Sequence, residues 1–125
     1  MADSELESLF KMIEELIAKV RGTAGVSDEE IEQIEIIIAK YRDEMANEKG
    51  STLTKMREDL YSLYNEHHNR VKSLEKYTPS WEKERKLRDM YFKFLNVPIL
   101  FLIGMRDETF VVTENGKNLN NDNEN

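Results

Sequence analysis

Apolar residues recur at intervals of three and four positions through most of the first 95 residues of this 125-residue chain. On an α-helix this spacing places the side chains on one face, so each segment that keeps it is predicted to be an amphipathic helix. The whole chain contains only two prolines and five glycines, which favours helices over a β-sheet protein with many turns. The sequence therefore predicts an all-α fold.

Four segments carry the helical pattern, and they are residues 4–21, 28–47, 52–76 and 79–96. The short connections between them let each helix return only beside its predecessor, which predicts an antiparallel four-helix bundle. The third segment has steps close to the heptad seam of a coiled coil, and as the longest helix it is expected to overhang its neighbours and offer a surface to another subunit. Ile36 points away from the apolar stripe of the second segment and is expected to be exposed.

Short polar side chains mark the predicted helix starts. Ser27 followed by Glu30 forms a capping-box pattern before the second helix, and the same pattern begins at residue 4. Gly50 is suited to terminate the second helix, and Ser51 or Thr52 is expected to cap the third. Thr78, directly before a proline, is expected to cap the fourth helix.

The second half of the fourth helix is apolar on nearly all sides. A helix of this kind has to be covered on most sides, either by the C-terminal residues of its own chain or by a second chain. The excess of apolar and aromatic side chains favours association, because a ligand pocket would also need convergent polar groups. The residues predicted to form a protein interface are Met90, Phe92, Phe94, Leu95, Ile99 and Phe101.

An apolar extension over residues 97–113 follows the four helices. The run at 99–103 is too short to separate a buried strand from a helical turn, whereas residues 109–113 are β-branched and typical of a strand. The pattern leaves a β-hairpin and a fifth helix open as alternatives for residues 99–113. Residues 1–113 are thus expected to form a single helical domain, and residues 114–125, which have little to bury, a disordered tail.

The search for catalytic or metal-binding chemistry returns no motif. The chain has no cysteine, no glycine-rich phosphate loop and no metalloprotease motif. The two histidines, His67 and His68, are adjacent and diverge by about 100° on a helix, and neither follows an acidic residue by three positions as in carboxylate-bridged metal bundles. His67 lies on the apolar face and is predicted to be partly buried and satisfied by a neighbour. We expect no enzymatic activity, no metal and no cofactor.

The charge is unevenly distributed along the chain. Residues 1–50 carry 6 basic and 13 acidic groups, residues 51–100 carry 10 and 7, and residues 101–125 carry 2 and 5, which gives −7, +3 and −3. The basic middle segment also contains aromatic rings, a combination that can bind nucleic acid. On a helical wheel, however, its charges encircle the helix, and this favours a solvated surface with local ion pairs. The candidate nucleic-acid-binding residues are Trp81, Lys83, Arg85, Lys86 and Arg88.

The sequence predicts a non-enzymatic helical interaction subunit or adaptor that binds another protein chain, either a copy of itself or a different one. An accessory subunit that binds DNA or RNA through residues 72–93 is the first alternative, and a small inhibitor that blocks a partner enzyme is the second. The acidic start lacks the basic region of a signal peptide, and the longest apolar run, residues 97–103, is too short to cross a bilayer. We therefore expect a cytoplasmic protein without a membrane partner.

Overall fold

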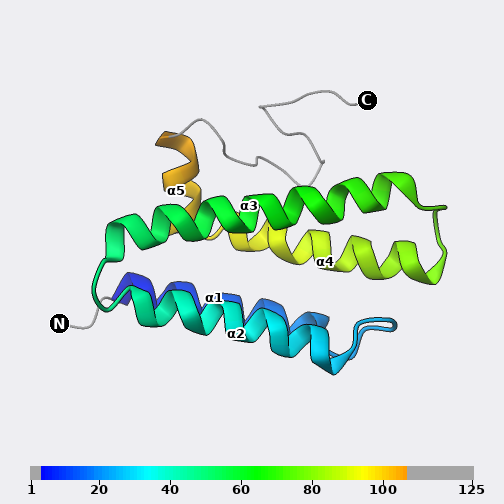
Figure 1. Cartoon of the computed structure of the whole chain (residues 1–125), viewed down its shortest axis with the longest axis horizontal. Coiled ribbons are helices and arrows are strands. Elements are labelled where there is room, and N and C mark those ends of the chain that lie inside the picture. Colours follow the sequence, from blue (N-terminus) through cyan, green and yellow to red (C-terminus); the bar gives the residue numbers. More distant parts are fainter. Residues whose placement is uncertain (1–3, 107–125) are drawn as a thin grey trace.

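The computed structural model describes residues 4–106, and all regular structure within this span is helical. Helices α1 to α4 lie along the long axis of the molecule and successive helices run in opposite directions, whereas α5 crosses them near one end (Figure 1). The helices are α1 (Ser4–Val20), α2 (Asp28–Glu44), α3 (Lys49–Ser73), α4 (Pro79–Leu95) and α5 (Pro98–Arg106).

The predicted caps of α2 and α4 are confirmed. The Ser27 hydroxyl accepts from the backbone N–H of Glu30 at 3.1 Å, and the Glu30 carboxylate accepts from the Ser27 N–H at 2.9 Å, which completes the capping box. Thr78 accepts from the N–H of Trp81 at 3.2 Å, and Pro79 occupies the first helical position. Two helix starts are therefore encoded locally by their side chains.

The predicted start of α3 is wrong. This helix begins at Lys49 rather than after Ser51 or Thr52, and Gly50 lies within it. The residue at the N-cap position, Glu48, makes no side-chain cap. An exposed helix start does not require one, because water can satisfy the first N–H groups. Thr52 is buried in the packed interior instead of capping, and its N–H bonds the Glu48 carbonyl at 3.1 Å, so the backbone becomes helical one turn earlier than the polar pattern suggests.

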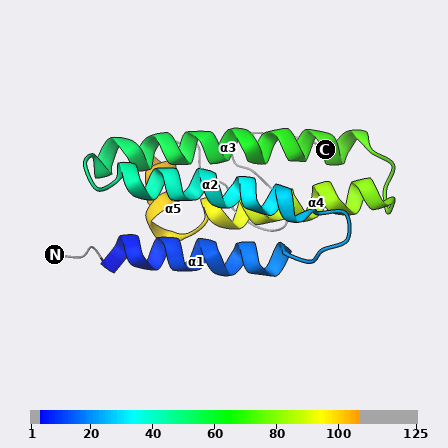
Figure 2. The same cartoon turned by 60° about the horizontal axis from the view of Figure 1, so that its bottom comes forward.

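The apolar stripes of all five helices meet in one core. Helices α3 and α4 pack together most extensively, and α5 packs against α1, α3 and α4 (Figures 1 and 2). Ile36 lies outside this core and is exposed, as predicted. The largest fully buried side chains are Leu9, Ile13, Ile31, Met56, Leu60, Phe94, Leu95 and Leu100.

The structure shows how the apolar second half of α4 is covered. The chain turns between α4 and α5, before Pro98, and α5 packs on α4, so the C-terminal residues of the same chain supply part of the cover. Of the two alternatives for the extension, residues 98–106 adopt the helix, and the rest of the segment, residues 107–113, lies outside the described residues together with the predicted tail at 114–125. No helix within residues 4–106 is both long enough and apolar enough to cross a membrane.

Candidate interaction surfaces

The structure divides the six predicted interface residues into two groups. Met90, Phe94 and Leu95 are buried in the core of the single chain and are closed to a second chain, which corrects the prediction for these three positions. The physical reason is that α5 and α1 cover the sides of α4 that α3 leaves open. Phe92, Ile99 and Phe101 are only partly buried.

Most of the predicted nucleic-acid-binding cations are paired within the chain. Lys83 Nζ lies 2.7 Å from Glu30 Oε2 on α2, Arg85 pairs with two carboxylates of its own helix, and Arg88 Nη2 lies 2.9 Å from Asp89 Oδ1. Lys86 is exposed. The local ion pairs that the helical wheel favours are therefore present, and they leave few cations of this set for a polyanion.

The Lys83–Glu30 pair links α4 to the start of α2. Burial alone would raise the pKa of Glu30, but the hydrogen bond from Lys83 and the bonds from Ser27 outweigh it and hold the pKa of this carboxyl below its usual range. The charge of Lys83 thus already has a stabilising partner. Glu30 serves both the capping box and this interhelical ion pair.

A second basic and aromatic group lies at the connection between α3 and α4. Tyr77 is 78% exposed and adopts a left-handed backbone with φ of 69°, which is uncommon for a residue other than glycine. Its ring lies 5.0 Å from the ring of Trp81, and the Arg85 guanidinium lies 5.4 Å above Trp81. The exposed lysines near these rings in sequence are Lys72, Lys76 and Lys86.

His67 is held between α3 and α4. Its Nδ1 lies 2.6 Å from Glu84 Oε1, and both side chains are nearly buried, with 12% and 13% exposure. The imidazole stacks on the ring of Tyr91 at 5.5 Å. The prediction of a partly buried histidine satisfied by a neighbour is confirmed, and within residues 4–106 no group of three or more side chains is arranged to hold a metal ion.

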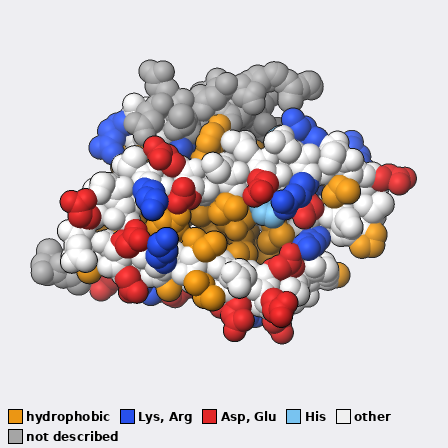
Figure 3. Space-filling model, in the orientation of Figure 1, with side chains coloured by type: hydrophobic (Ala, Val, Ile, Leu, Met, Phe, Trp, Pro, Cys, Tyr) orange, Lys and Arg blue, Asp and Glu red, His pale blue; other side chains and the backbone are white. Residues whose placement is uncertain are grey.

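Apolar side chains also reach the surface between α2 and α3. They gather in the middle of the face shown in Figure 3, with a histidine at the edge and charged side chains around them. Helix α2 therefore does not fully cover the apolar side chains on this face.

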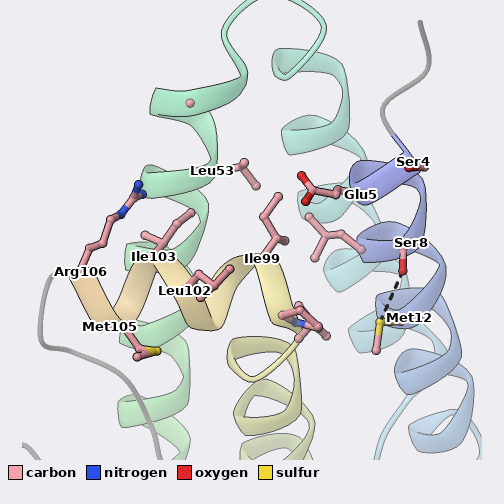
Figure 4. A pocket seen from close by; sticks show the side chains of 14 residues that line it. Ser4, Glu5, Ser8, Met12, Leu53, Ile99, Leu102, Ile103, Met105 and Arg106 are labelled. Atoms are coloured by element: carbon pink, nitrogen blue, oxygen red, sulfur yellow. Dashed lines mark hydrogen bonds between the residues drawn. The ribbon is translucent and has the colours of Figure 1, made fainter.

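A groove with a volume of ≈ 950 Å³ lies between α1, the first turns of α3, and α5. Apolar side chains dominate its wall, and three of them are exposed to solvent: Leu102 at 59%, Met105 at 49% and Met12 at 37% exposure. Ile99 and Leu53 lie between the α5 and α1 sides of the groove (Figure 4).

Charged groups stand at the two opposite sides of this groove. Glu5 lies on the α1 side, beside Ser4 and Ser8, and Arg106 lies on the far side at the end of α5 (Figure 4). The region between them is apolar. The groove therefore has a negative side and a positive side separated by exposed hydrophobic residues.

A buried arginine, which the sequence reading did not single out, holds α5 in place. Arg57 on α3 is 3% exposed, and its Nε donates to the Leu100 carbonyl at 3.2 Å. Gly104 passes so close that a Cβ at this position would stand 2.3 Å from Nη2 of Arg57. The signal in the sequence was the position of Arg57, four residues after Leu53 and three before Leu60, on the apolar face of its helix.

Comparison with protein families, with curated proteins and with solved structures found no match to this chain.

Proposed function

We propose that the chain is a non-enzymatic interaction subunit with the architecture of an antiparallel four-helix bundle, and that it binds another protein chain through the groove between α1, α3 and α5. The observation that carries this proposal is the exposure of Leu102 and Met105 on a helix whose other face is buried. Exposed apolar surface that lines a groove is typical of a docking site.

The groove is held in shape before any partner arrives. The Arg57–Leu100 hydrogen bond and the close fit of Gly104 hold α5 against α3, so its outer face needs little ordering on binding. Covering a Leu or Met side chain completely contributes roughly 1.5–3 kcal/mol, so Leu102 and Met105, each about half exposed, offer about 2–3 kcal/mol together. This supports a docking role for the exposed face of α5.

Site-specific cross-linking tests the docking surface. A photoreactive amino acid replaces Leu102 in one variant and Ile36 in the other, because both side chains are 59% exposed but Ile36 is on α2 and outside the groove. In an extract of the native host we expect defined cross-linked species from position 102 and none above background from position 36. Equal labelling from both positions, or none from position 102 with or without extract, would contradict the proposal. A cross-linked enzyme whose activity falls on binding would identify the inhibitor alternative.

A second candidate function, binding of single-stranded nucleic acid, is supported by the connection between α3 and α4. The exposed ring of Tyr77 beside Trp81 offers a stacking surface, and the exposed lysines at positions 72, 76 and 86 could contact phosphates. This site differs from the sequence prediction, because Lys83, Arg85 and Arg88 are already paired with carboxylates.

Salt titration distinguishes this second function. Binding of a fluorescent single-stranded oligonucleotide should weaken steeply with salt if three lysines contact phosphates. Alanine at positions 72, 76 and 86 should abolish this binding, whereas alanine at 11, 40 and 55, three other exposed lysines, should not. Equal loss in both triple variants would indicate nonspecific charge attraction.

A further inference from the structure

We infer that the groove between α1, α3 and α5 receives the same groove of a second copy of the chain, related by a two-fold axis. This inference rests on the proposed function and names the partner. It follows from the charge arrangement of the groove and from the composition of α5.

Helix α5 is suited to face another copy of itself. Its sequence from Pro98 to Arg106 contains no acidic residue, and its one cation stands at the last position. Leu102 and Met105 project on the exposed side. Two such faces brought together would bury hydrophobic side chains without enclosing an unpaired charge between them, which is the costly outcome at an interface.

The positions of Glu5 and Arg106 favour one orientation of the two-fold axis. In a two-fold contact the same surface serves both copies, so any residue that meets a second residue across the contact is met by it in return. Glu5 and Arg106 stand on opposite sides of the apolar strip (Figure 4). When the two-fold axis lies in the plane of the contact and perpendicular to the line from Glu5 to Arg106, Arg106 of one copy faces Glu5 of the other, and this occurs twice. A two-fold axis along that line would instead oppose like charges.

Met12 extends the complementary apolar strip onto α1. It is 37% exposed, and it lines both this groove and the smaller hollow between α1 and α4. In the two-fold arrangement, Met12 lies where Met105 of the other copy can cover it. Flexible methionine side chains fill such gaps readily.

Sedimentation velocity over a range of concentrations tests the partner. We expect the 125-residue chain to dimerise, and we expect Leu102→Glu to shift the protein to monomer at concentrations where the original chain is dimeric. Ile36→Glu is the matched control, because it introduces the same charge at a side chain of the same 59% exposure and should remain dimeric. Far-ultraviolet circular dichroism checks that each variant keeps its helices.

Charge reversal tests the two-fold register. Arg106→Glu alone and Glu5→Arg alone should each raise the dimer dissociation constant by roughly tenfold, since each removes two rim ion pairs and creates two repulsions. The double variant restores opposite charges in every pair and should recover most of the affinity. A double variant as weak as the single variants would overturn the two-fold register.

Two results would overturn the second copy as the occupant. One is a monomer at all accessible concentrations, and the other is a dimer that Leu102→Glu and Ile36→Glu affect equally.

Cross-linking from position 102 distinguishes failure of the self-association inference from failure of the proposed docking function. Self-cross-links in the purified protein support the second copy, whereas cross-links to other proteins in extract, without self-cross-links, retain the docking function alone. Cross-links from a monomer to its own residues 107–125 would contradict both.

Discussion

Within residues 4–106, Arg57 is the only charged residue that is buried, with 3% exposure. Its guanidinium lies under α5, where Nε bonds the Leu100 carbonyl, and 5.5 Å from the ring of Tyr61. A buried charge is tolerated when hydrogen bonds replace its hydration. Because Gly104 leaves room for the guanidinium, these two residues depend on each other.

We predict that Gly104→Ala destabilises the protein by about 1–3 kcal/mol, the usual range for overpacking a core. The added Cβ would stand 2.3 Å from Nη2 and 2.6 Å from Nε of Arg57, so the buried guanidinium would have to move and weaken its bond to Leu100. The midpoint of urea unfolding measures the change.

Gly50→Ala is the control for this glycine substitution. A Cβ at Gly50 would meet nothing within 4 Å, and Gly50 lies inside helix α3. Alanine at this position should raise stability by up to about 1 kcal/mol, because glycine is a poor helix former. If both variants shifted the unfolding midpoint in the same direction, the tight fit of Gly104 against Arg57 would be refuted.

At the level of the helices, local sequence signals account for some boundaries and not for others. The starts of α2 and α4 were predictable, because Ser27 and Thr78 each supply an oxygen to a backbone N–H of the first turn. The start of α3 was not predictable in this way. There Thr52 is buried in the assembled core, and its burial depends on residues distant in sequence, which a local polar pattern does not report.

Two serines that the sequence suggests as helix caps provide a test of this difference. Ser27→Ala should destabilise the protein by about 1 kcal/mol, because it removes the acceptor for the Glu30 N–H. Ser51→Ala should cost little or slightly stabilise, because Ser51 lies within α3 and its exposed hydroxyl bonds only the side chain of Glu48. Urea unfolding of both variants gives the comparison, and an equal cost at both positions would support the cap position that the sequence suggested.

The candidate site was only partly predictable for the same reason. The sequence indicated that the region around α4 and α5 holds more apolar surface than one helix face can bury, and Ile99 from that prediction does line the groove. The sequence could not show that Met90, Phe94 and Leu95 would be buried in the core, because their burial depends on where the chain turns between α4 and α5. The exposure of Leu102, the most exposed of the large hydrophobic side chains in the groove, depends on the same turn.

At the scale of the whole molecule, three tyrosines connect the packing of the helices to alkaline pH. Burial raises the pKa of Tyr91 to about 12. Burial raises the pKa of Tyr41, and its hydrogen bond to the Asp59 carboxylate adds to this effect. Burial also raises the pKa of Tyr64, against the opposing effect of Arg88. All three hydroxyls therefore keep their protons in the folded chain at a pH where the unfolded chain would lose them.

We predict that the free energy of unfolding decreases as pH rises from about 10 to 12. An unfolded tyrosine loses its proton near pH 10, so below that pH the raised pKa of a folded tyrosine does not change the free energy of unfolding. Above that pH, ionisation stabilises the unfolded state. Each such tyrosine then lowers the free energy of unfolding by about 1 kcal/mol per pH unit. For Tyr91 this decrease continues until the folded pKa, about 12, is passed.

Tyr91→Phe should match the original chain within about 1 kcal/mol at pH 7, because a phenylalanine ring can keep the contacts with His67 and Phe94. Its stability should then fall less steeply above pH 10. Urea unfolding at a series of pH values, followed by circular dichroism, measures both slopes, and parallel curves for the two proteins would show that burial of the Tyr91 hydroxyl does not contribute to the alkaline instability.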